Sequence, residues 1–186
     1  IHKDCQKDEA ADFRVKKYQL DFSVGLNLTG SAKVYVDRSE LKSYRFTLYH
    51  GYKVKQVTDQ TGAALDFRRE YDYVTVTRGG AAVEYLCLEY TGKSPKYYSS
   101  YAGVCLPANF AYYPIPGYRE LFSDNFYGFI DCSLPYDTAF DVRCSGRKQM
   151  YCNLAARGDN HFAGNAHSIT LLSGYYDTLK LNDTLV

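Results

Sequence analysis

The chain has 186 residues, of which 46% are hydrophobic and 23% charged, and its 22 basic and 21 acidic residues give a net charge of +1. This hydrophobic content is ordinary for a globular protein and excludes an intrinsically disordered chain. The balanced charge argues against nucleic acid as a partner, because a nucleic-acid-binding surface needs a clustered basic face. We expect residues 1–186 to form a single domain.

The first half of the chain alternates apolar and polar residues in short stretches, which is the period of half-buried β-strands. Residues 1–12 are charged and aperiodic, and we expect a loose lead-in there. Gly25, Gly51 and the Gly79-Gly80 pair mark turns between the strands that follow. These strands are predicted at residues 18–24, 27–36, 44–50, 52–57, 65–67, 73–77 and 83–90.

Residues 91–135 break this pattern, since they are rich in Tyr, Phe, Pro and Gly and contain all five prolines. One interpretation is an aromatic platform on which a sugar or peptide stacks. The other is a long connection packed on the core, where tyrosine hydroxyls bond stray backbone groups. Packing is favoured, because sugar-binding platforms mostly use Trp side chains and the chain has no Trp. The candidate interaction or packing segment consists of Leu106, Pro107, Phe110, Tyr112, Tyr113 and Pro114.

Strand patterns resume after this connection, at residues 140–144, 149–155 and 166–173, while residues 119–125 are expected to form one short helical turn. Many short strands with frequent turns are typical of a sandwich or an open barrel. The lack of long helical periods excludes a doubly wound fold. The sequence therefore predicts an all-β protein, an antiparallel β-sandwich with a long aromatic-rich connection.

Residues that could bind a metal ion or take part in catalysis are scattered along the sequence rather than clustered. His161 and His167 are the best metal candidates and lie near Asp159, but a third ligand with a defined spacing is missing. Neither a nucleophile elbow nor a phosphate loop is present. We therefore expect no catalytic residue, no cofactor and no metal ligand in this chain.

Six cysteines allow fifteen disulfide connectivities, and none of their spacings is the C-x2-C of a zinc ribbon or a redox motif. Buried free thiols are favoured for most of them, because Cys87, Cys144 and Cys152 lie inside predicted strands. The cysteine pattern is compatible with an oxidising and with a reducing compartment.

Several short motifs follow one another in a recognisable order. They are the opening strand at residues 18–24, Tyr90-Thr91-Gly92 at a strand end, Cys152-Asn153-Leu154 after a hairpin, and the last strand through Gly174. Their order resembles the N-terminal β-sandwich domain of the M1 (gluzincin) aminopeptidases, over about residues 15–174. Leu106-Pro107 and the later Tyr112-Tyr113-Pro114 resemble the Leu-Pro and Trp-Tyr-Pro pattern of M1-like regions fused to bacterial ABC-2-type transporter permeases.

The chain also departs from that family. Its zinc motif H-E-x-x-H and its peptide-binding motif G-x-M-E-N are both absent. Residues 100–109, where the family's sandwich offers a Gln or Glu to the substrate amine, contain no Gln, Glu or Arg. No functional residue is therefore carried over, and the isolated chain is not expected to be an enzyme.

The resemblance implies a non-catalytic module of a larger, membrane-anchored protein that lies outside the cytoplasm and acts in structural support or in protein or peptide interaction. The chain begins at Ile1 and lacks an apolar run near the roughly 20 residues that span a bilayer. We therefore expect a piece of a longer polypeptide, with the rest of that polypeptide as its partner and no membrane insertion by this segment. Two alternatives stay open: a carbohydrate- or peptide-binding module, and the N-terminal domain of an active zinc aminopeptidase.

Overall fold

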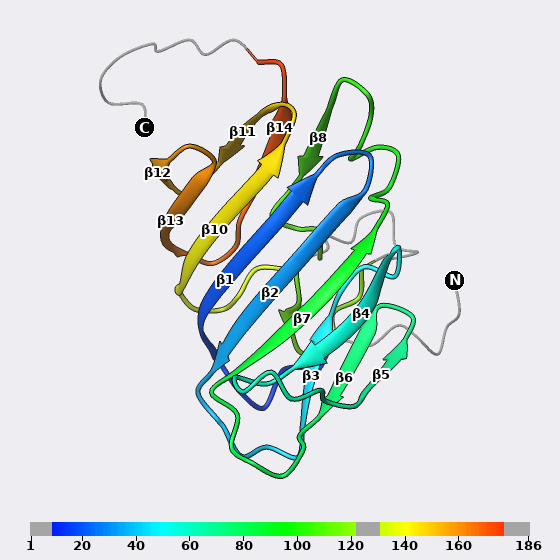
Figure 1. Ribbon diagram of the computed structural model, residues 1–186, viewed down its shortest axis with the longest axis vertical. Coiled ribbons are helices and arrows are strands. Elements are labelled where there is room, and N and C mark those ends of the chain that lie inside the picture. Colours follow the sequence, from blue (N-terminus) through cyan, green and yellow to red (C-terminus); the bar gives the residue numbers. More distant parts are fainter. Residues whose placement is uncertain (1–8, 122–130, 177–186) are drawn as a thin grey trace.

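The computed structural model describes residues 9–121 and 131–176, which form fourteen strands and no helix (Figure 1). The predicted all-β fold is confirmed. The strands are β1 (Val15–Val24), β2 (Leu28–Val36), β3 (Ser43–Thr47), β4 (Tyr52–Thr58), β5 (Phe67–Glu70), β6 (Tyr73–Thr77), β7 (Tyr85–Gly92), β8 (Gly103–Leu106), β9 (Ile115–Pro116), β10 (Thr138–Gly146), β11 (Gln149–Cys152), β12 (Ala155–Gly158), β13 (His161–Ala166) and β14 (Leu171–Gly174).

A seven-stranded sheet forms one layer of the sandwich, in the order β12-β13-β10-β1-β2-β7-β4. Its pairs are antiparallel except for β1 with β10, which run parallel. The strict alternation that predicted β1 and β2 appears as alternating burial, so Leu20 and Phe22 face inward while Asp21 and Ser23 face outward. At the centre of the sheet Gly30 leaves room for the Tyr90 ring, because a Cβ there would lie 2.5 Å from Tyr90 Cζ.

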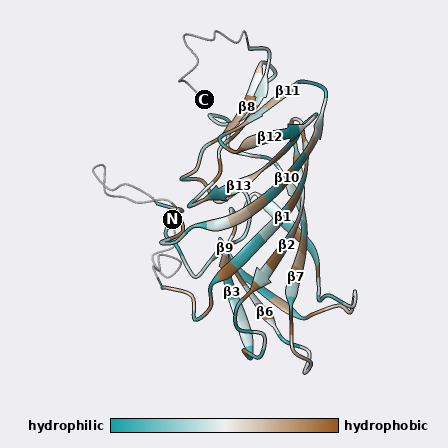
Figure 2. Ribbon diagram, turned by 90° about the vertical axis from the view of Figure 1, so that its left-hand side faces the viewer, coloured by the Kyte–Doolittle hydropathy of each residue, from teal (hydrophilic) through white to brown (hydrophobic). Residues whose placement is uncertain are grey.

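Two smaller sheets form the second layer, one of four strands (β5-β6-β3-β9) and one of three (β11-β14-β8). Figure 2 shows the layer of β3 and β9 separate from that of β1, β2 and β7. Buried side chains from both layers make one hydrophobic core, including Leu20 and Val34 of the large sheet, Phe46 of β3 and Leu171 of β14. The sandwich thus follows from strands that are each apolar on one face only.

Several predicted strand boundaries are wrong. The predicted strand at 44–50 ends at Thr47, because the chain then crosses between the sheets and its amides bond elsewhere: Leu48 N–H to Asp72 O and Tyr49 N–H to Ala111 O. The predicted strand at 149–155 is divided into β11 and β12, and that at 166–173 is divided between β13 and β14, which lie in different sheets. The predicted helical turn at 119–125 falls largely outside the described residues.

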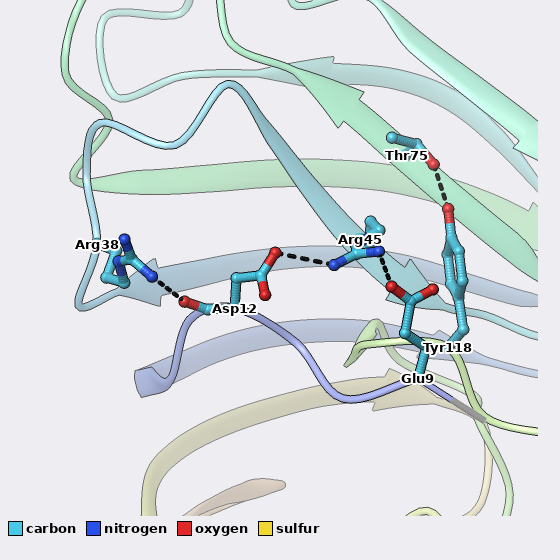
Figure 3. Close-up of polar contacts among 6 residues, drawn as sticks. All are labelled: Glu9, Asp12, Arg38, Arg45, Thr75 and Tyr118. Carbon is cyan, nitrogen blue, oxygen red and sulfur yellow. Dashed lines mark hydrogen bonds and ion pairs between the residues drawn. The ribbon is translucent and has the colours of Figure 1, made fainter.

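The lead-in is held to the small sheet from Glu9 onward, while residues 1–8 lie outside the described residues. Glu9 exchanges backbone hydrogen bonds of 2.7 and 2.8 Å with Tyr118. Arg45 on β3 forms ion pairs with Glu9 and with Asp12, the latter at 2.8 Å. Figure 3 shows the two ion pairs of Arg45 and the hydrogen bond between the Tyr118 and Thr75 hydroxyls, which are 2.5 Å apart. The lead-in and the later part of the aromatic connection therefore meet over β3 and β6.

Candidate functional site

The aromatic segment predicted from the sequence lies inside the molecule. Leu106 ends β8, and the chain then turns so that Phe110 N–H donates to Pro107 O at 3.0 Å. Tyr112 and Tyr113 are completely buried, and Phe110 is 4% exposed. Leu106 and Pro114 are buried as well, and Pro107 is half-buried. These rings pack in the core, so they offer no exposed face on which a ligand could stack.

Tyrosine hydroxyls satisfy the backbone of this irregular segment, which has almost no strand partners of its own. Tyr18 on β1 donates to Pro114 O at 2.8 Å, and Tyr90 on β7 donates to Tyr112 O at 2.9 Å. The Tyr112 hydroxyl donates in turn to Ile169 O at 2.9 Å. A buried carbonyl group without a partner is costly. Tyrosine therefore suits this core because its ring fills space while its hydroxyl reaches a carbonyl group.

Burial also fixes the protonation state of these tyrosines. It raises the pKa of Tyr18, Tyr90, Tyr112 and Tyr113 above the ordinary value for a phenol, because the phenolate form would lose its hydration. The Tyr113 hydroxyl approaches the Ile169 backbone without forming a hydrogen bond of standard geometry to any described residue. A general acid needs a pKa near the working pH. These hydroxyls therefore have structural roles.

The histidines singled out in the sequence do not share a ligand site. His161 on β13 contacts Asp141 Oδ1 through Nε2 at 2.9 Å. His167 contacts Leu134 O through Nδ1 at 2.8 Å and lies 3.4 Å from Asp137. Across residues 9–121 and 131–176, no group of three or more His, Cys, Asp and Glu side chains is arranged to hold a metal ion.

The described cysteines are free thiols with different environments, and Cys5 lies outside the described residues. Cys132 is completely buried and Cys105 is exposed. Burial raises the pKa of the Cys132 and Cys144 thiols to about 12 in both cases, which keeps them protonated and unreactive.

Sequence reasoning missed a histidine–carboxylate pair in which a buried carboxylate, Asp72, contacts an exposed histidine, His50. Asp72, 5% exposed in the β5–β6 turn, accepts the His50 backbone N–H at 2.6 Å, and its Oδ1 lies 2.9 Å from His50 Nδ1. Burial raises the pKa of Asp72, and the neighbouring His50 and Arg69 oppose that shift. The His50 ring stacks on Tyr71, with centroids 4.2 Å apart. The pair fixes the crossover from β3 to β4, and no local period in the sequence indicates such a contact.

The outer face of the seven-stranded sheet carries a hollow of about 470 Å³. Asp21, Ser31 and Glu89 lie side by side across its floor, because they are register partners on β1, β2 and β7. Lys55 and Arg143 also line it, so acids and bases balance. An adjoining hollow of about 180 Å³ shares Asp21 and Arg143. Most of the lining surface between these charged groups is apolar, so the hollow suits a neutral ligand that has both apolar and polar faces.

No protein-family model and no curated protein matches the sequence. Solved structures do match the fold. An M1 zinc metallopeptidase from Deinococcus radiodurans is 14% identical, with a TM-score of 0.58 over 89% of this chain and 42% of that chain. Native leukotriene A4 hydrolase from Saccharomyces cerevisiae is 11% identical, with a TM-score of 0.59 over 98% of this chain and 33% of that chain.

These similarities define the class of the fold, which is that of the N-terminal region of M1 zinc metallopeptidases. A third match, yeast LTA4 hydrolase in complex with bestatin, agrees with a TM-score of 0.61 at 12% identity over 94% of this chain and 31% of that chain. The chain spans only 31% to 42% of the length of these three proteins. The similarity therefore concerns one β-rich region of much larger proteins.

Proposed function

We propose that this chain is a non-catalytic β module of a larger M1-peptidase-like protein, and that it supports and contacts the rest of that polypeptide. The observation that carries the proposal is the unequal coverage of the structural matches. They extend over 87% to 98% of this chain but over 31% to 43% of the matched proteins. A module of this kind contributes a rigid surface that the rest of the polypeptide contacts.

The chemistry of the described residues supports this role. The tyrosines of the aromatic segment are held neutral inside the core, and the histidines bind separate partners. H-E-x-x-H does not occur in the sequence. A catalytic zinc ion requires three protein ligands and an open position. Purified chain is therefore expected to hold no stoichiometric zinc and to release no amine from aminoacyl substrates.

The proposal extends to the setting of the parent protein: we propose that this module is fused to an ABC-2-type permease, whose membrane segments anchor it, and that the module lies outside the cytoplasm. The support is the pattern of Leu106-Pro107 followed by Tyr112-Tyr113-Pro114. In the described part of the chain no helix is long and apolar enough to cross a membrane. The anchor would therefore belong to other parts of the parent.

The sequence of the full-length gene, followed by assay of its product, tests this function. Transmembrane segments without H-E-x-x-H, and a product without chelator-sensitive aminopeptidase activity, are the expected result. H-E-x-x-H downstream, with one zinc per chain and hydrolysis that a chelator abolishes, would instead make the chain the N-terminal domain of an active aminopeptidase. A gene that encodes this β module alone would contradict the proposal.

A second candidate function is the binding of a neutral carbohydrate, and the hollow on the outer sheet face favours it. Carboxylate and guanidinium groups can each hydrogen-bond to adjacent sugar hydroxyls, and Asp21, Glu89 and Arg143 offer them around one hollow. Titration calorimetry with hexasaccharides of glucose, xylose and N-acetylglucosamine tests this function. Binding that Arg143→Ala abolishes, while the exposed control Arg147→Ala retains it, would support it. If none of the three hexasaccharides bound, this second candidate function would be refuted.

A further inference from the structure

Four connections lie together at one end of the sandwich, and we name them the tyrosine tip: residues 25–27, 93–103, 146–149 and 174–176. The strand register brings them together. β1 pairs at this end with both β2 and β10, β2 pairs with β7, and β14 pairs with β8 and β11. Figure 1 shows the β1–β2 turn, the β10–β11 turn and the start of β8 at the upper end of the molecule.

The tip gathers most of the exposed large apolar side chains of the described residues. Of the six that are exposed, Tyr71 lies on the β5–β6 turn, outside these four connections. The other five, with their exposed fractions, are Leu26 (55%), Tyr97 (69%), Tyr101 (87%), Tyr175 (82%) and Tyr176 (46%). Contacts join part of this set: Lys148 Nζ donates to the Tyr101 carbonyl and lies 5.3 Å from the Tyr175 ring centroid. Lys148 thus brings Tyr101 and Tyr175 into one patch.

The charge of the tip is of one sign, although the chain as a whole is nearly neutral. Within the four connections, whose residues are all described, there are four basic side chains and no Asp or Glu. The basic residues are Lys93, Lys96, Arg147 and Lys148, and all but the half-buried Lys148 are exposed. A partner that complements this end is therefore negatively charged and also accepts amphipathic rings.

We propose that the tyrosine tip docks on the surface of a lipid bilayer that contains anionic lipid. Tyrosine rings prefer the membrane–water interface, where the ring meets apolar groups and the hydroxyl stays hydrated. Lysine and arginine beside them are attracted to anionic headgroups. A bilayer is favoured over an acidic protein because the tyrosines project into solvent, whereas protein interfaces centre on anchors that fill pockets. This inference does not rest on the proposed function, since it needs neither a permease nor a peptidase in the parent.

Flotation with vesicles of phosphatidylcholine, with and without a minority of phosphatidylglycerol, tests this inference on the whole chain. We expect binding only to the anionic vesicles, and its loss at high salt. The double variant Lys96→Gln/Arg147→Gln is expected to lower the partition coefficient about 25-fold, at about fivefold for each charge. The double variant Tyr101→Ser/Tyr175→Ser is expected to lower it as well.

The control variant Lys42→Gln/Arg68→Gln removes the same net charge away from the tip, at an exposed lysine and at an arginine side chain that is 82% exposed. It should bind vesicles as the unchanged chain does, and circular dichroism should show all three variants folded. Equal losses of vesicle binding in the tip and control variants would show that binding depends only on net charge, and would overturn the proposal. No binding to anionic vesicles would overturn it too, and capture of soluble polyglutamate in place of vesicles would assign the tip to an acidic protein.

Discussion

The Tyr112 hydroxyl donates a 2.9 Å hydrogen bond to the Ile169 carbonyl oxygen, across 57 residues of sequence. Both residues are completely buried. The bond ties the irregular aromatic segment to the chain just before β14, where neither has a strand partner. The adjacent Tyr113 is equally buried, but its hydroxyl makes no such bond with a described residue. Comparing variants of Tyr112 and Tyr113 therefore distinguishes the contribution of a buried ring from that of a hydrogen-bonded hydroxyl.

Removing these two hydroxyls should have unequal effects. Tyr112→Phe leaves the Ile169 carbonyl group buried without its donor, so we expect the free energy of unfolding to fall by about 1–3 kcal/mol. Tyr113→Phe removes a buried hydroxyl without a bond of standard geometry and leaves no partner unpaired, so we expect no loss of stability. Urea unfolding measures both values. Equal losses in the two variants would show that the Tyr112–Ile169 bond contributes nothing specific.

Alkaline pH should unfold the protein steeply. Burial raises the folded-state pKa of Tyr18, Tyr90, Tyr112 and Tyr113, whereas in the unfolded chain tyrosine titrates near its ordinary value of about 10. Above that pH the unfolded chain has released protons that the folded chain keeps. Stability is therefore fully present below about pH 10 and falls by about 1.4 kcal/mol per pH unit for each such tyrosine.

Tyrosinate absorbance and circular dichroism, followed together as the pH rises, check this prediction. The buried tyrosines should ionise in the same narrow pH range in which the strand signal disappears. Ionisation of all the tyrosines near pH 10, with the sandwich still folded, would contradict the burial described for this core.

Local sequence patterns predicted the parts of the fold that depend on one strand and its neighbour. The alternation in β1, β2 and β6 follows directly from burying one face of each strand, so these elements lie close to their predicted positions. The parallel pairing of β1 with β10 was not predicted, because it joins segments more than a hundred residues apart, such as Lys17 and Ala139. No local period encodes that choice of partner. The division of residues 166–173 between two sheets was missed for the same reason.

The residues of the candidate site were likewise predicted only in part. A run of tyrosines and prolines without a period marked the aromatic segment as unusual, and the segment proved to be an irregular part of the core. The His50–Asp72 pair and the tyrosine tip were not foreseen, since each is assembled from separate turns. Tyr101 and Tyr113 show why composition alone is insufficient: they are the same residue type in one long connection, yet Tyr101 is 87% exposed and Tyr113 is fully buried.

The close approach of β4 and β7 should make Gly92 intolerant of any side chain. A Cβ at this position would lie 1.8 Å from the Gly51 carbonyl oxygen, so the backbone itself must move. We expect Gly92→Ala to destabilise the fold by more than about 3 kcal/mol, in the range of severe core substitutions. Gly158→Ala is the matched control, because no heavy atom lies within 4 Å of its added Cβ. Thermal unfolding of both variants measures the difference, and similar melting temperatures would show that these strands lie farther apart.

The Tyr113 ring should be a major contributor to stability. It packs edge-on against Tyr18 and Tyr112, with centroid distances of 5.4 and 5.1 Å, and a cavity would remain if it were removed. Tyr113→Ala is expected to lower the free energy of unfolding by about 3–5 kcal/mol. For a chain of this size that corresponds to a fall in melting temperature of roughly 6–20 °C. Tyr101→Ala, at an exposed ring of the same long connection, should change the free energy by less than about 0.5 kcal/mol. If Tyr113→Ala melted like the unchanged chain but lost affinity for a glycan or a peptide, the segment would be a binding platform and the packing role would be refuted.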